Sequence, residues 1–141
     1  MKKALLSARD PVGVGLAAPQ VGKSLQIFIA KPTIKSPILV FINPKVVSSI
    51  DYQVLSKKND SIHNTKLEGC LSLPNIWGEV KRNPTIKLQY QLITENLELI
   101  TRTHTFSGFM ATIIQHEMDH LQGTLFPKRV LEQKGILYKS H

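Results

Sequence analysis

The chain has 141 residues, 42% of them hydrophobic, and its 18 Lys and Arg residues against 10 acidic residues give a net charge of +8. This length suffices for one domain with one hydrophobic core and is too short for two, so we expect a single domain over residues 1–141. No apolar run approaches the length of a membrane span, and no signal-type stretch follows Met1-Lys2-Lys3, so we expect a cytoplasmic protein without membrane segments.

The start of the chain predicts a helical turn followed by a glycine-rich loop. Residues 1–9 can form a short turn of helix, which Asp10-Pro11 ends. Residues 12–22, VGVGLAAPQVG, lack both the GK[ST] ending of a phosphate-binding loop and the spacing of a dinucleotide-binding loop. The small residues favour a close backbone approach to a ligand or to another element, and a plain turn is the alternative.

Most of the middle of the chain has the pattern of β-strands. Apolar and polar residues alternate from Ile86 to Leu92, as is typical of a strand with one buried face. The predicted strands are residues 25–30, 38–42 (ended by Asn43-Pro44), 45–55, 79–81, 86–93 and 97–106, with a polar loop at 56–65 and an apolar stretch at 67–74. Because the strands come first and one long helix comes late, we expect an α+β fold with antiparallel β-sheets packed around a central α-helix.

The long helix is expected over residues 109–121, a stretch free of Pro and Gly. Ser107 or Gly108 can cap its start, and Gly123 can end it. Spacings of three, four and seven residues place one set of side chains on a common face: Phe109, Thr112, Ile113, His116 and His120. We therefore expect a buried helix whose histidines face inward. The tail, residues 128–141, can form a short final helix.

His116, Glu117 and His120 form the pattern HExxH within QHEMDH. Side chains four residues apart lie one above the other on a helix, so both imidazoles can bind one metal ion. A carboxylate beside them can take a proton from a metal-bound water. The alternative is two ordinary surface histidines, in a pattern that chance would produce about once in a hundred such chains. The central helix is therefore predicted to bind a metal.

Cys70 is the only cysteine, which excludes an intramolecular disulfide. A lone cysteine in a reducing compartment is most often buried and inert. A nucleophile and a thiolate metal ligand are the two reactive alternatives. The second is attractive because two histidines on a helix still need a third ligand.

The basic residues are scattered, apart from pairs such as Lys57-Lys58 and Lys81-Arg82, and no nucleic-acid-binding motif accompanies them. A net positive charge can draw a protein to the RNA surface of the ribosome. We nevertheless expect a solvated basic surface that recognises no specific nucleic-acid sequence.

Three separated stretches, in their order along the chain, resemble the motifs of one family. They are GVGLAAPQ at residues 13–20, EGCLS at 68–72 and QHEMDHLQG at 115–123. Peptide deformylases carry the patterns GxGLAAxQ, EGCLS and HExxH, and the chain matches each of them. The resemblance implies a bacterial (cytoplasmic) or organellar enzyme that removes the formyl group from the N-terminal N-formylmethionine of newly made polypeptides and releases formate. Its implied partners are N-formylmethionyl nascent peptides and, transiently, the ribosome.

Within this resemblance, Cys70, His116 and His120 match the metal ligands, and Glu117 matches the general acid/base. The implied cofactor is one divalent ion, typically Fe²⁺ in the cell, with Zn²⁺ or Ni²⁺ in prepared material. Three protein ligands leave a fourth position for water, whose pKa falls from about 15.7 to about 7 on coordination. Metal-bound hydroxide would attack the formyl carbonyl, and Glu117 would take a proton and deliver it to the departing amine.

The resemblance also assigns residues to substrate binding. Gln20 matches the side chain that stabilises the oxyanion, helped by the backbone N–H of Leu71. The backbone of Val14 and Gly15 and the region of Gly69 match the edge along which the peptide lies as an added strand.

Two further sets of residues are expected near the site. Glu68 and Arg82 occupy the positions of a carboxylate–arginine pair in the family, for which a purely structural role is as plausible as a direct one. Phe109, Thr112 and Ile113 share the helical face of His116, so we expect them to line an apolar pocket for the methionine side chain.

Two other functions stay open from the sequence. A zinc peptidase with HExxH would take a third His or Glu from downstream, where Glu132 is the only acidic candidate. A catalytically degenerate deformylase-like protein would bind the ribosome or nascent chains without turnover, although Cys70, Glu117 and Gln20 are all present. The resemblance also implies a longer N-terminal segment than the 12 residues that precede Gly13.

Overall fold

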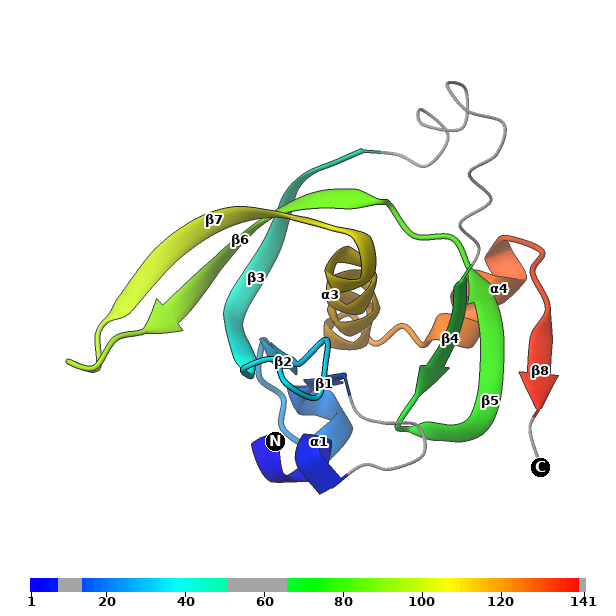
Figure 1. Ribbon diagram of the computed structural model, residues 1–141, viewed down its shortest axis with the longest axis horizontal. Coiled ribbons are helices and arrows are strands. Elements are labelled where there is room, and N and C mark those ends of the chain that lie inside the picture. The colour runs from blue at the N-terminus through cyan, green and yellow to red at the C-terminus, as the bar shows by residue number, and fades with distance from the viewer. Residues whose placement is uncertain (8–13, 51–65, 140–141) are drawn as a thin grey trace.

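The computed structural model describes residues 1–7, 14–50 and 66–139 (Figure 1). Its elements are, in chain order, α1 Lys2–Ser7, β1 Gly15–Ala17, the 3-10 helix η1 Ala18–Val21, β2 Ile27–Ala30, β3 Leu39–Ile50, β4 Lys66–Cys70, β5 Leu73–Val80, β6 Thr85–Ile93, β7 Leu99–Ser107, α3 Gly108–Leu121, α4 Phe126–Glu132 and β8 Leu137–Lys139. The sequence features at Asp10-Pro11, at Gly13 and in the loop at 56–65 lie outside the described residues.

The larger sheet has five strands in the order β1-β2-β3-β6-β7, and every neighbouring pair is antiparallel. In β6 the alternation of the sequence becomes an alternation of burial. Ile86, Leu88 and Tyr90 are buried, whereas Lys87 and Gln89 are exposed. The buried face meets α3 and forms the main hydrophobic core of the described residues, with these members: Ala17, Phe28, Ala30, Phe41, Ile86, Leu88, Tyr90, Ala111, Ile113 and Ile114.

The smaller sheet has three antiparallel strands in the order β4-β5-β8. The apolar stretch at 67–74 spans the end of β4, the turn at 71–72 and the start of β5, and the strand register shifts between Gly69 and Cys70. One face of this sheet packs on α4, where Cys70 and Val80 form a second core cluster with Phe126 and Val130. Cys70 therefore stands at the end of a strand whose backbone is fixed by pairing and packing.

Helix α3 lies between the two sheets, with the larger sheet on one side and β4, β5 and α4 on the other (Figure 1). It contacts β1, β2, β6 and β7 of the larger sheet. This arrangement confirms the predicted α+β fold, with antiparallel sheets around a central helix. Among the described residues, no helix is long and apolar enough to cross a membrane.

Strand β3 differs from its prediction. The sequence predicts a strand end at Asn43-Pro44, but β3 runs through these residues as one strand. The register against β6 shifts between Ile42 and Lys45, and Asn43 adopts a positive φ of 47°. Such an irregularity accommodates Pro44, which cannot donate a hydrogen bond to a neighbouring strand.

The tail also differs from its prediction. The short final helix predicted within 128–141 is α4, which begins two residues earlier, at Phe126, and ends at Glu132. The strand β8, which was not predicted, follows it. Pro127 stands in the first turn of α4, where its missing N–H costs nothing. Pairing with β5, in the register Trp77↔Tyr138, then favours the extended backbone of β8. Two smaller differences are that residues 79–80 belong to β5 and that the glycine-rich loop contains β1 and η1.

Candidate active site

The second half of α3 carries His116, Glu117 and His120 at the centre of the site. The helix begins after Ser107, an N-cap residue with extended backbone. It ends at Leu121, followed by the C-cap Gln122 and by Gly123, whose φ is +76°. Its apolar residues hold one side of the helix against the larger sheet. The predicted inward orientation of the histidines follows, since His120 is buried and His116 nearly so.

Cys70 meets the two histidines from the end of β4. Its Sγ lies 3.2 Å from His120 Nε2, which in turn lies 3.2 Å from His116 Nε2. The three donor atoms are all within 4.8 Å of one another. Bond lengths of about 2.3 Å to sulfur and 2.0–2.1 Å to nitrogen would separate tetrahedral ligand atoms by roughly 3.3–3.6 Å. The donor set therefore fits a single ion. Of the three roles that the sequence left open for Cys70, its position fits that of a thiolate metal ligand.

Contacts among Cys70, His116, His120 and Glu68 shift the pKa values of Cys70 and His116 in opposite directions. Burial alone would raise the pKa of Cys70, but hydrogen bonds from His116 and His120 outweigh it and lower that pKa to about 5. Burial alone would lower the pKa of His116, but hydrogen bonds to Cys70 and Glu68 outweigh it and raise that pKa to about 10. At neutral pH the site thus holds a thiolate, which is the form of cysteine that binds metals.

Glu68 and Arg82 lie together behind His116. The Glu68 carboxylate accepts two hydrogen bonds from Arg82, at 2.7 Å from Nε and 3.0 Å from Nη2. Its second oxygen is 2.9 Å from His116 Nδ1. A carboxylate on Nδ1 fixes the ring orientation and leaves Nε2 to face the metal position. Despite burial, which acts in the opposite direction, the hydrogen bonds from His116 and Arg82 lower the pKa of Glu68.

Glu117 is only 3% exposed, and its carboxylate lies beside Gly15 of β1. A Cβ atom on Gly15 would stand 2.7 Å from Glu117 Oε1 and 3.0 Å from Ile113 Cγ2, so any larger residue would displace the Glu117 carboxylate from its present position. Glu117 Oε2 is the one buried side-chain polar atom without a hydrogen-bond partner in the described part of the chain. Burial raises the pKa of Glu117 to about 8, with the negative charges of Cys70 and Glu68 adding to the effect and His116 opposing it.

Gln20, in η1, is fixed beside Cys70. Its Oε1 accepts a hydrogen bond of 2.8 Å from the backbone N–H of Ala17. Its Nε2 donates to Ser72 Oγ at 3.0 Å and lies 3.5 Å from Cys70 Sγ. The amide group of Gln20 therefore presents its N–H side to the metal position.

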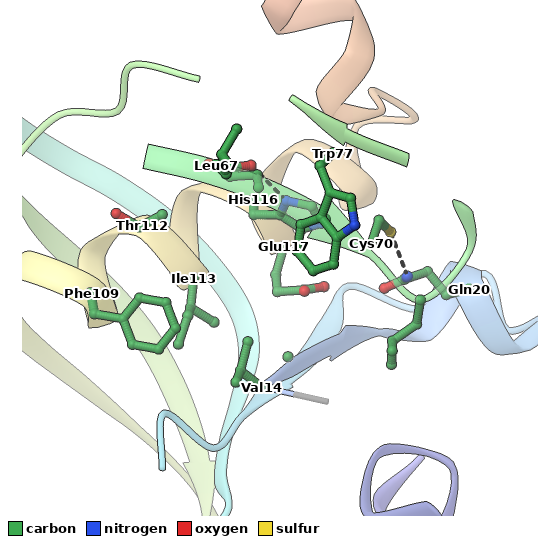
Figure 2. A pocket seen from close by; sticks show the side chains of 14 residues that line it. Val14, Gln20, Leu67, Cys70, Trp77, Phe109, Thr112, Ile113, His116 and Glu117 are labelled. Atoms are coloured by element: carbon green, nitrogen blue, oxygen red, sulfur yellow. Dashed lines mark hydrogen bonds and ion pairs between the residues drawn. The ribbon is translucent and has the colours of Figure 1, made fainter. Parts of the chain in front are cut away.

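These side chains open into one cavity of about 350 Å³. Figure 2 shows the Glu117 carboxylate between an end formed by Cys70 and Gln20 and an end formed by Val14, Phe109 and Ile113. The residues that line this cavity are Val14, Gly15, Gln20, Leu67, Glu68, Gly69, Cys70, Leu71, Trp77, Phe109, Thr112, Ile113, His116 and Glu117. The structure thus brings together every predicted site residue except Arg82, which touches Glu68, and His120, which touches Cys70 and His116.

A family model for polypeptide deformylase matches residues 1–135. The chain belongs to the peptide deformylase family. Its Cys, His, His metal site is that of a deformylase. Because Cys70 supplies the third donor, the site does not need the downstream His or Glu that an HExxH zinc peptidase would use.

Individual deformylases resemble the chain in sequence and in fold. The peptide deformylase of Chlorobium phaeobacteroides is 42% identical over 126 residues, which cover 89% of this chain and 62% of that protein. The solved structure from Thermus thermophilus gives a TM-score of 0.74 at 34% identity, covering 94% of this chain and 69% of that one. A Synechococcus elongatus deformylase, solved in complex with actinonin, gives a TM-score of 0.66 at 36% identity. The match covers 84% of this chain and 58% of that one. The chain spans about three fifths of the length of the curated relatives it matches.

The sequence predicts no role at this deformylase site for Leu67 or Arg129. It places Trp77 only as a packing or rim residue near the site and Asp119 only as a supporting or capping partner on the HExxH helix. Trp77 and Leu67 line the cavity, and a Cβ on Gly69 would stand 2.6 Å from the Trp77 ring. The pairing of β4 with β5 places Trp77 opposite Gly69, a cross-strand relation that no local pattern reveals. Asp119 and Arg129 form an ion pair behind the site, and only the spacing of Asp119 on the HExxH helix hinted at a supporting role.

Proposed function

We propose that this chain is a metal-dependent peptide deformylase, which removes the formyl group from the N-terminal N-formylmethionine of newly made polypeptides and releases formate. The observation that carries the proposal is the position of the Glu117 carboxylate, which has one unpartnered oxygen. It stands in a cavity lined by Cys70 and His116, whose donor atoms group with that of His120, and by apolar side chains at the other end.

A divalent ion held by Cys70, His116 and His120 would polarise the formyl carbonyl and acidify a water ligand to a pKa of about 7. Glu117 accepts the proton of the attacking water at its unpartnered oxygen and returns it to the nitrogen of the departing amine. Without an ion, burial raises the pKa of Glu117 to about 8, whereas the positive charge of a bound ion would lower that pKa. The ionised carboxylate could then accept the proton and hold it until it passes to the amine.

The developing negative charge on the formyl oxygen needs fixed donors. Gln20 Nε2 and the backbone N–H of Leu71 fill this role in the proposal. Gln20 is held in advance by Ala17 and Ser72, so that its donor needs little reorganisation during the reaction. Loss of one such donor typically raises the barrier by roughly 3–4 kcal/mol.

The peptide is proposed to bind as an added strand. β1, which Val14 precedes and Gly15 begins, is an edge strand of the larger sheet, and β4, which carries Gly69, is an edge strand of the smaller one. Both edges border the cavity, so their free backbone groups can pair with an extended peptide. The methionine side chain would enter the apolar end of the cavity, lined by Phe109, Thr112 and Ile113.

The proposed metal is Fe²⁺ in the cell, with Zn²⁺ or Ni²⁺ in prepared material. One thiolate and two imidazoles are donors that suit all three ions, so cellular availability selects among them. The proposed partners are N-formylmethionyl nascent peptides and, transiently, the ribosome, whose RNA would attract a chain of net charge +8. The proposed location is the bacterial cytoplasm or an organelle.

The test is the reaction of formyl-Met-Ala-Ser with protein reconstituted with Fe²⁺ without oxygen. We expect formate release with the tripeptide left intact, and inhibition by actinonin, the compound in the Synechococcus elongatus deformylase complex. Cleavage of a peptide bond would instead identify a peptidase. Metal-loaded protein that binds formyl-Met-Ala-Ser without releasing formate would identify a degenerate, non-catalytic relative.

A further inference from the structure

Helix α4 packs directly behind the donors of the metal site. The ring of Phe126 lies 6.0 Å from that of His116, at an interplanar angle of 28°. Phe126 and Val130 also share a core cluster with Cys70. A Cβ atom on Gly78 would stand 2.6 Å from the Val130 side chain, so β5 holds α4 at very close range. A displacement of α4 would therefore change the packing around two of the metal ligands, Cys70 and His116.

A chain of charged contacts runs from α4 to His116. Arg129 donates to both oxygens of Asp119, at 3.1 Å from Nε and 2.9 Å from Nη2. Asp119 Oδ2 also accepts a hydrogen bond of 2.7 Å from Arg82 Nη1. Arg82 in turn makes the two-point contact with Glu68, whose carboxylate is 2.9 Å from His116 Nδ1.

The charges alternate along this chain, and its interior members are largely removed from water. Asp119 is 7% exposed and the Arg82 side chain is 8% exposed, whereas the Arg129 side chain is 34% exposed. A buried carboxylate needs compensation for its lost hydration. Without Arg129, Asp119 would depend on Arg82 alone and would draw that guanidinium away from Glu68.

We propose that Arg129 is a positioning residue for the metal site. By holding Asp119 at two points, Arg129 keeps Arg82 on Glu68, and Glu68 keeps the His116 ring aimed at the ion. Arg129 acts through these partners and touches none of the three donors. The inference rests on the proposed metal-dependent function, because it concerns the same donors.

The experiment compares variants of the full chain loaded with Co²⁺, whose absorption spectrum reports ligand geometry. Arg129→Gln removes the charge and the two-point contact, whereas Lys128→Gln removes one exposed charge from the same helix as a matched control. We expect Arg129→Gln to release Co²⁺ to a chelator about tenfold faster than the unchanged protein and to shift the visible bands. Lys128→Gln should do neither.

Arg129→Lys provides the second arm. It keeps the charge, and with it the docking of α4, but an ammonium cannot reproduce the planar two-point contact with a carboxylate. We expect Arg129→Lys to release Co²⁺ at a rate between those of Arg129→Gln and the unchanged protein. Its visible bands should be shifted less than those of Arg129→Gln. If Arg129→Gln fails to fold, the comparison of Arg129→Lys with Lys128→Gln tests the positioning role.

Unchanged Co²⁺ release and an unchanged spectrum in both Arg129 variants would overturn the positioning role, even if the unfolding temperature fell. In that case formate release by the unchanged protein would still support the proposed function. If the unchanged protein bound no Co²⁺ at all, the proposed metal site would be wrong. The proposed function and the positioning role of Arg129 would then both be contradicted.

Discussion

Glu117 is the residue on which the proposed chemistry depends most. Its environment combines three features that rarely occur together: deep burial, a neighbouring glycine that leaves room for the carboxylate, and an oxygen without a partner. A buried carboxylate oxygen without a hydrogen-bond partner lowers stability, so its presence calls for a functional explanation. The same reasoning explains why Gly15 belongs to the site even though it has no side chain.

Replacement of Glu117 by Gln tests this role. The amide keeps the size of the side chain but cannot take or return a proton, so we predict that kcat falls by roughly 10²- to 10⁴-fold. Metal content should stay unchanged, because Glu117 is not among the three donors. Formate release and elemental analysis measure the two quantities. Near-normal turnover in this variant would remove Glu117 from the mechanism.

His116 leads to a prediction about pH. Its pKa of about 10 in the metal-free protein means that it carries a proton at neutral pH, which an incoming metal ion must displace. A raised pKa of His116 therefore makes metal affinity increase with pH. The increase is about tenfold per unit between the Cys70 pKa of about 5 and the His116 pKa of about 10. Calorimetry in buffers of different protonation enthalpy should show release of about one proton per ion at pH 7.5. Metal binding without proton release would contradict this description of His116.

Among the elements, the sequence was most informative where one local pattern determines the structure. The alternation from Ile86 to Leu92 identified β6, and the HExxH stretch identified α3 with its ligands on one side. It was least informative where distant segments decide. Cys70 had three possible roles until β4 placed its sulfur 3.2 Å from His120, and Trp77 lines the cavity because β5 pairs with β4.

Strand β3 shows why a local rule can mislead. Pro44 favours a strand end because proline cannot donate to a ladder, yet pairing on both sides of the irregularity keeps the strand continuous. Asn43 makes this possible, since asparagine tolerates a positive φ better than most residues, and its side chain also donates to Gln91 at 2.8 Å.

We predict that Asn43→Val lowers the free energy of unfolding by about 1–2 kcal/mol relative to Asn43→Gly, because a β-branched residue disfavours a φ of 47°. Both variants lose the contact with Gln91, so the comparison isolates the backbone effect. Urea denaturation with unchanged m-values measures the difference. Equal stability of the two variants would show that β3 does not depend on this backbone conformation.

In the molecule as a whole, the metal site lies where the two sheets and the central helix meet. The smaller sheet supplies Cys70, α3 supplies both histidines, and β1 of the larger sheet borders Glu117. An ion bound here would link segments that are otherwise joined mainly by packing. Metal binding should therefore stabilise the whole fold as well as create the reactive centre. That residues 1–141 form a single domain stays a prediction.

Removal of the metal tests this coupling. An ion present at 100 times its Kd stabilises the folded state by roughly 2.7 kcal/mol, which corresponds to an increase in Tm of about 9 °C for a chain of this size. Cys70→Ser should bind the ion weakly and lose most of that increase. Thermal unfolding with Zn²⁺ and with a chelator provides the comparison. Equal Tm values in the two conditions would show that the ion does not bridge the fold.

The most direct test of the account is X-ray absorption at the metal edge of the Zn²⁺-loaded protein. If Cys70, His116 and His120 hold one ion, the spectrum should fit one sulfur at about 2.3 Å and two imidazole nitrogens at about 2.0–2.1 Å, and the sulfur contribution should disappear in Cys70→Ser. A spectrum of the unchanged protein without a sulfur neighbour would contradict the account at its centre.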